Sequence, residues 1–159
     1  MYEDERTRMR RYLETEISRL SALVRLTGGE VPGFTDSDGA RPFIRLDEDG
    51  RLRQLARERG ELVLDRVTRD PRELLYWVFE GATFEAAGAW AVEHPREGEE
   101  QRVTIWTRQA SLLHVLDPEW ARRRRAELVG SLADPADHRL VPALPPPPLL
   151  FDPPSPPDR

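Results

Sequence analysis

Residues 73–84, ELLYWVFEGATF, hold the densest hydrophobic run of the chain and constrain its fold most. Asp70-Pro71 precedes this run and is typical of a helix start, because Asp caps free N–H groups and Pro fits the first turn. We predict a helix from Asp70 to about His94, with Glu73 at capping-box spacing. Apolar residues cover two of its sides, including Trp77, Phe79 and Phe84. This helix is therefore expected in the core, between a sheet and other helices, and lining a ligand pocket is the alternative.

The rest of the chain predicts an α+β fold around that helix. The expected order is an N-terminal helix, a small antiparallel three-stranded meander, and three helices packed on it. An apolar stripe at helical spacing predicts the first helix, and a glycine pair is expected to end it; the stripe consists of Met9, Leu13, Ile17, Leu20 and Val24. Turn residues separate the strands. The expected elements are helices at 4–27 (ended by Gly28-Gly29), about 99–116 (apolar stripe Val103, Trp106, Ala110 and Leu113) and 117–132, and strands near 42–47, 51–57 and 61–68, with turns at Asp49-Gly50 and Gly60.

The last part of the chain has a different composition. Nine of the fifteen prolines follow Leu140. Proline has no N–H group to donate and fixes its own backbone, so such a segment forms no helix or ladder. We therefore expect a single domain over residues 1–140, and an extended or disordered Pro-rich tail over residues 141–159.

The chemistry-bearing residues form no recognisable catalytic or metal-binding pattern. The chain has no cysteine, and His94, His114 and His138 lack partners at metal-ligand spacing. The serines lie in no nucleophile motif, and no glycine-rich loop resembles a phosphate-binding loop. We expect a protein that is not an enzyme and has no metal, cofactor or small-molecule substrate.

Net charge and hydropathy exclude two further classes. At −5, the chain is a poor candidate for binding nucleic acid, which requires a basic surface. No apolar run is long enough to span a membrane, and the charged N-terminal residues do not resemble a secretory signal. We expect a cytoplasmic protein that binds no membrane.

Two clusters of charge are candidates for binding a partner. Arg122–Arg125 could contact phosphate or an acidic protein, but we expect a solvated helix face paired with Glu119 and Glu127. The second cluster lies on a loop and a hairpin tip, where binding surfaces are common. An acidic surface there would suit a basic partner, although solubility alone would explain it. Its six carboxylates are Glu30, Asp36, Asp38, Asp47, Glu48 and Asp49.

Several motifs, in order, resemble the immunity protein 63 family of bacterial polymorphic toxin systems. Glu58-Arg59-Gly60 precedes a strand, and Thr68 to Glu80 follows the pattern T-x-D-x-x-E-L-L-Y-W-V-F-E, with Thr83-Phe84 after it. A helix then carries Gln109 followed by Leu112-Leu113, and Pro118 to Arg123 reads P-E-W-x-x-R. The resemblance covers about residues 42–132 and excludes the proline tail.

This resemblance implies a small α+β protein, encoded beside a toxin, that binds and neutralises that toxin inside the producing cell. It implies no catalytic residue and does not identify the toxin. A regulatory or scaffold protein that offers its proline tail to an aromatic groove is the alternative.

Overall fold

The computed structural model describes residues 3–153 and begins with helix α1, Glu3–Leu23. Its buried stripe is the predicted one, with Leu13, Ile17 and Leu20 facing the core. The helix ends earlier than expected, and the glycine pair does not end it. Arg25 adopts a φ of 55°, and the Leu26 N–H donates to the Ser21 carbonyl oxygen, which closes the last turn.

The three-stranded sheet is antiparallel, in the order β1-β2-β3, as predicted. Its strands are β1 (Phe43–Leu46), β2 (Leu52–Glu58) and β3 (Glu61–Thr68). Gly50 and the pair Arg59-Gly60 turn the chain with positive φ, the backbone that tight hairpins need. β3 is an edge strand and leaves Leu62, Val63 and Val67 largely exposed.

Helix α2, Pro71–Glu93, starts where the sequence predicts. The Asp70 carboxylate accepts from the Arg72 N–H at 2.9 Å and caps the helix. The expected capping box does not form. The Asp70 N–H donates to the Thr68 hydroxyl instead, and the Glu73 carboxylate binds Arg123, fifty residues further along the chain.

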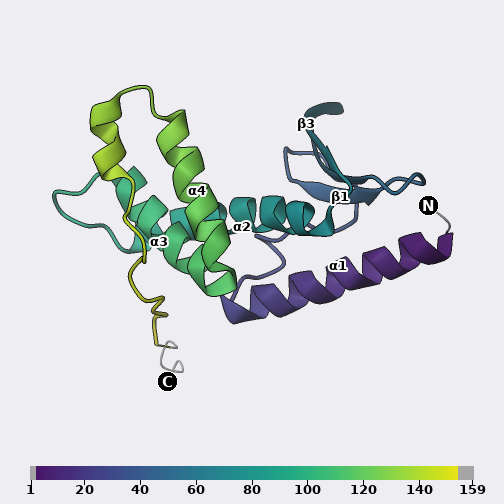
Figure 1. The fold of residues 1–159 in the computed structure, drawn as a ribbon, viewed down its shortest axis with the longest axis horizontal. Coiled ribbons are helices and arrows are strands. Elements are labelled where there is room, and N and C mark those ends of the chain that lie inside the picture. Colours follow the sequence, from purple (N-terminus) through teal and green to yellow (C-terminus); the bar gives the residue numbers. More distant parts are fainter. Residues whose placement is uncertain (1–2, 154–159) are drawn as a thin grey trace, which may run out of the picture.

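The core is centred on α2, as predicted. Figure 1 shows α2 in the middle of the molecule, with the sheet above it and α1 below it. Phe79 is fully buried and stacks on Trp120 of α4, with ring centroids 6.0 Å apart. Two aromatic residues that were predicted to lie in the core do not, since Trp77 is only half-buried and Phe84 is 44% exposed.

Helices α3 (Gln101–Leu116) and α4 (Pro118–Ser131) complete the domain. The Asp117 carboxylate caps α4 through the Glu119 N–H, as the repeated Asp-Pro pattern predicts. The expected apolar stripe of α3 is wrong except for Leu113. Val103, Trp106 and Ala110 are half-buried, whereas the buried residues are Thr104, Gln109, Ser111, Leu112 and Leu113.

A short 3-10 helix, η1, over Pro135–Leu140 leads into the proline-rich segment. Residues 141–153 form no helix or strand, as expected, but they lie against the helices. Val141 is 4% exposed, Leu144 and Leu149 pack against core residues, and the Ser111 hydroxyl donates to the Pro147 carbonyl at 2.7 Å. The described part of the tail therefore contacts the domain, and the boundary at Leu140 stays a prediction. Residues 154–159 lie outside the described part.

Candidate functional site

The six acidic residues of the predicted binding cluster do not gather at one place. Asp36 and Asp38 lie on the loop before β1 and bond to residues at the β2–β3 end of the sheet. Asp47, Glu48 and Asp49 form the β1–β2 turn. The two groups are about 20 Å apart, because they flank opposite ends of the seven-residue β2.

The β1–β2 turn is an ion-pair network with little unpaired charge. The Asp47 carboxylate accepts from Arg53 at 2.6 Å and from Arg45 at 3.2 Å. Burial raises the pKa of Asp47, but the two guanidinium groups outweigh burial and hold that pKa below its ordinary value. The backbone N–H of Arg51, and then its side chain, lower the pKa of Asp49. Arg53 continues the network to Asp65 on β3.

The carboxylates of the loop before β1 hold that loop in place. Asp36 accepts from Arg57 at 3.1 Å, and Asp38 accepts from the Gly60 N–H at 3.1 Å. Glu30 accepts from both the N–H and the hydroxyl of Thr27. Charge at this end of the sheet is therefore partly neutralised within the chain, and binding by these residues stays a prediction.

The arginine run 122–125 is not the solvated face that we expected. Arg122 pairs with Glu119 as predicted, and Arg123 lies 4.0 Å from Glu127, the second predicted partner, but the other contacts of the run are with α2 and the tail. Arg123 binds both oxygens of Glu73 at 2.6 Å, Arg124 lies 3.2 Å from Glu80, and Arg125 donates to the Pro142 carbonyl. Successive side chains turn by about 100° around a helix, so the four arginines reach four different neighbours. The run ties α4 to α2 and to the tail.

Arg123 lies at the centre of a polar cluster between α2 and α4. Its guanidinium is 3.8 Å from the centre of the Tyr76 ring, and the Tyr76 hydroxyl donates to Glu127. Burial, and then Glu127, raise the pKa of the Tyr76 hydroxyl. Arg123 in turn holds the pKa of Glu73 below its ordinary value. The hydroxyl therefore stays protonated and the carboxylate ionised, and the cluster is a structural clamp.

Gln109 forms a second polar cluster, fully buried between α2 and α3. Its amide nitrogen donates to the Glu80 carbonyl at 2.9 Å and to the Thr83 hydroxyl at 3.3 Å. Its amide oxygen accepts from Arg124 at 3.2 Å. Both ends of the amide have partners, so Gln109 fixes the packing of three helices and leaves no group to act on a substrate.

The tail carries a cluster of aromatic and cationic side chains. The Arg108 guanidinium lies between the rings of Trp90 and Phe151, at 4.6 Å and 5.7 Å from their centroids. The His94 ring stacks on Trp90 and pairs with Asp152 at 3.0 Å. The bond to the Trp90 carbonyl, and then Asp152, raise the pKa of His94. These contacts hold the tail on α2 and α3.

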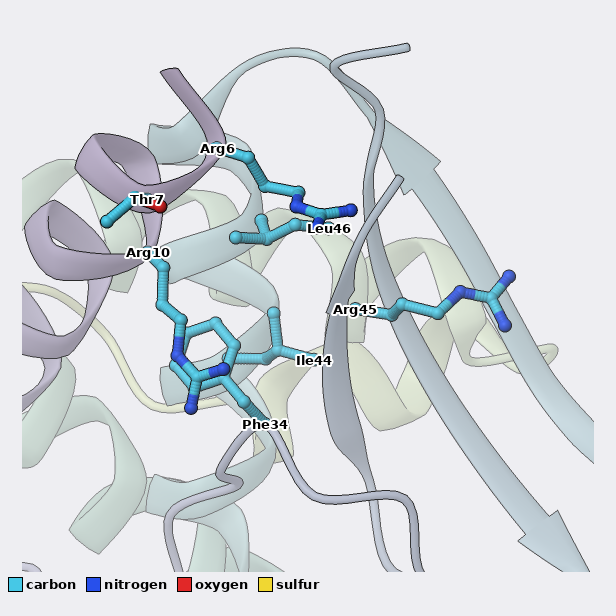
Figure 2. A pocket seen from close by; sticks show the side chains of 7 residues that line it. All are labelled: Arg6, Thr7, Arg10, Phe34, Ile44, Arg45 and Leu46. Atoms are coloured by element: carbon cyan, nitrogen blue, oxygen red, sulfur yellow. The ribbon is translucent and has the colours of Figure 1, made fainter. Parts of the chain in front are cut away.

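A groove of about 300 Å³ lies between α1 and β1. Figure 2 shows Arg6 extending from α1 toward the strand and Arg10 extending from α1 toward Phe34, with Phe34, Ile44 and Leu46 as the apolar residues of the groove. Arg45 also lines the groove, but its side chain extends from the other side of β1, where it pairs with Asp47. Arg10 stacks over Phe34 at 4.8 Å. The sequence analysis missed this groove, because its residues belong to three separate segments.

Within residues 3–153, no three His, Asp or Glu side chains are placed to hold a metal ion. Over the same range, no histidine bonds to a serine hydroxyl, and Ser111 and Ser131 donate to backbone carbonyls. None of the described helices is long and apolar enough to cross a membrane.

The comparisons with known proteins gave one match. A family model described as Immunity protein 63 matches residues 48–129, just over half of the chain. The matched region runs from the β1–β2 turn through β2, β3, α2 and α3 into α4. Searches of curated proteins and of solved structures found no match.

Proposed function

The chain belongs to the immunity protein 63 family, and on that premise we propose that it binds and neutralises a toxin domain encoded beside it. Members of such families protect bacteria that carry toxin systems. Neutralisation would take place in the cytoplasm of the producing cell, before the toxin is released. The family match is the observation that carries the proposal, since it covers the whole of α2 together with β2, β3, α3 and most of α4.

We infer that the chain acts by binding and has no turnover of its own. Immunity proteins are generally not enzymes. The buried polar side chains of Tyr76 and Gln109 support this inference, because each is engaged in packing helices. A tight protein inhibitor needs an interface of about 1,600 Å² in total, with aromatic or arginine anchors. A small domain of this size can present such a surface.

The six acidic residues remain a proposed contact for a toxin with a basic cleft, such as a nuclease. The structure changes how this proposal is tested. Asp47 is only 15% exposed and holds three arginines, so reversing its charge would damage the hairpin. Asp36 and Asp49, one from each group, are 58% and 48% exposed and can be reversed with less damage.

Co-expression with the neighbouring toxin tests the function directly. We expect wild-type cells to survive toxin induction, and titration calorimetry on the purified pair to show tight binding without turnover of toxin or substrate. The variant Asp36→Arg/Asp49→Arg should bind more weakly if the acidic residues meet the toxin, because like charges then face each other. Unchanged affinity in that variant would reject the acidic contact. No binding by the wild type would reject the immunity function.

The scaffold alternative gains no support from the tail. The segment 145–148 would have to be free to enter an aromatic groove. It lies against α3 instead, with the Pro147 carbonyl bonded to Ser111. We therefore keep toxin neutralisation as the single proposed function.

A further inference from the structure

Two arginines continue the apolar stripe of α1 toward its N-terminus, where Arg6 is half-buried and Arg10 is exposed. Arg6 and Arg10 precede Leu13 and Ile17 at spacings of four, three and four, so all four residues lie on one stripe of the helix. Leu13 and Ile17 are buried in the core. This stripe carries arginines in place of apolar residues where α1 passes β1. Arg6 extends toward the strand, and Arg10 lies against Phe34 (Figure 2).

β1 presents unused backbone groups to the same groove. The Asp47 N–H donates to the Arg51 carbonyl, and bonding alternates along an antiparallel strand, so residues 44 and 46 turn their N–H and C=O groups away from β2. The Ile44 N–H confirms this direction, since it donates to the Gly33 carbonyl at 2.8 Å. No described segment pairs with the N–H or C=O of Leu46.

The groove also has charge without a partner. No described residue pairs with the Arg6 guanidinium, and Arg10 makes one exposed pair, with Glu14 at 2.9 Å. An exposed pair of this kind stabilises little, so an incoming carboxylate could replace Glu14 at small cost. The half-buried Phe34 and Leu46 supply apolar surface to the groove, and Ile44, which is 1% exposed, lies beneath them.

These three properties select one kind of occupant. Free strand groups suit an extended backbone, the apolar wall suits an apolar side chain, and two guanidinium groups suit a carboxylate. We propose that this groove, which we call the α1–β1 groove, binds an extended segment of the toxin that adds a strand to β1 and places an acidic side chain between Arg6 and Arg10. The inference rests on the proposed function and names a surface for toxin binding that is separate from the six acidic residues.

The other edge of the sheet is a weaker candidate. β3 is longer and exposes Leu62, Val63 and Val67, but the α1–β1 groove does not extend to it. Its charges are mixed, with Glu61, Asp65 and Arg66 all exposed. Nothing along β3 therefore selects the sequence or the charge of a partner, whereas the α1–β1 groove selects both.

Charge reversal on the two sides of α1 provides a matched test. The variant Arg6→Glu/Arg10→Glu changes the groove, and Arg8→Glu/Arg11→Glu makes the same charge change on the exposed side of the same helix. We expect the groove variant to raise the Kd for the cognate toxin about tenfold or more, because the two introduced Glu side chains would repel the acidic side chain of the toxin. The control variant should stay within about twofold of wild type. Circular dichroism melts of both variants check that the fold is kept.

Amide hydrogen exchange on the complex tests the added strand. The Leu46 amide should become protected when the toxin binds, and the Val67 amide on β3 should not. Equal weakening by the two double variants, or no protection at Leu46, would overturn the inference while leaving toxin binding intact. A change in self-association caused by Arg6→Glu/Arg10→Glu would mean that a second copy of the chain fills the groove, which also overturns it. Failure of the wild type to bind toxin would instead reject the proposed function.

Discussion

Replacing Phe79 with Ala tests whether α2 is the centre of the core. Phe79 is fully buried and stacks on Trp120 at 6.0 Å with an interplanar angle of 21°. Truncating a buried Phe costs about 3–5 kcal/mol of unfolding free energy, and the ring pair adds about 0.5–1.5 kcal/mol beyond area burial. We expect a loss of about 4 kcal/mol, which is a third or more of the stability of an ordinary domain.

The measurement is urea unfolding followed by circular dichroism. With a slope of about 2 kcal/mol per molar urea, a loss of 4 kcal/mol moves the midpoint down by about 2 M. Phe84→Ala is the matched control, because it makes the same chemical change on the same helix at a residue that is 44% exposed. That variant should lose less than about 1 kcal/mol. Equal losses in the two variants, or a loss below about 1 kcal/mol for Phe79→Ala, would refute the assignment of the core.

Two further predictions concern the tail and the polar clamp. A chain ending at Leu140 should melt about 5 °C or more below the full chain, because it loses buried Val141 and the packing of Leu144 and Leu149; an unchanged Tm would support the domain boundary at Leu140. Arg123 lowers the pKa of Glu73 in the folded state, so the stability from this pair is present above the ordinary value of 4.5 and is lost as pH falls through the folded pKa. Unfolding in urea at pH 7 and at about pH 3 should show a smaller pH dependence for Glu73→Gln than for wild type, and identical dependence would mean that the pair contributes nothing.

The sequence predicted most of the fold because its strongest signals are local. The Asp70-Pro71 and Asp117-Pro118 pairs predicted two helix starts, and in the structure Asp70 and Asp117 cap these helices. The end of α1 was missed for an equally local reason. Arg25 has a positive φ, which residues other than glycine rarely adopt. The sequence therefore predicted the helix end at the next glycines, Gly28-Gly29, and not at Arg25.

The errors arose where a distant residue decides the outcome. Gln109 is buried because the Glu80 carbonyl and Arg124 meet it in space, and apolar spacing along α3 cannot show this. The arginine run was misread for the same reason, since Glu73 binds Arg123 across fifty positions. The prolines of the tail correctly indicated extended backbone, but composition does not show whether that backbone docks.

For the candidate site too, the sequence showed the local features and missed the contacts between distant residues. The sequence located a cluster of carboxylates but not the arginines that neutralise them, because those pairs form across the sheet. It also identified the apolar stripe of α1 from Met9 onward without noticing that Arg6 and Arg10 continue it. Their role becomes visible only when β1 is placed beside the helix (Figure 1).

The clamp around Arg123 has a consequence for how this chain can change over generations. The side chain binds both oxygens of Glu73 and at the same time lies over the Tyr76 ring, 3.8 Å from its centroid. A planar guanidinium can satisfy both neighbours, whereas the compact ammonium of lysine offers neither the fork nor the flat face. Arginine can often be replaced by lysine on a protein surface, but at this position the replacement would lose both contacts. The chain has no lysine anywhere, and at Arg123 the geometry supplies a physical reason for that choice.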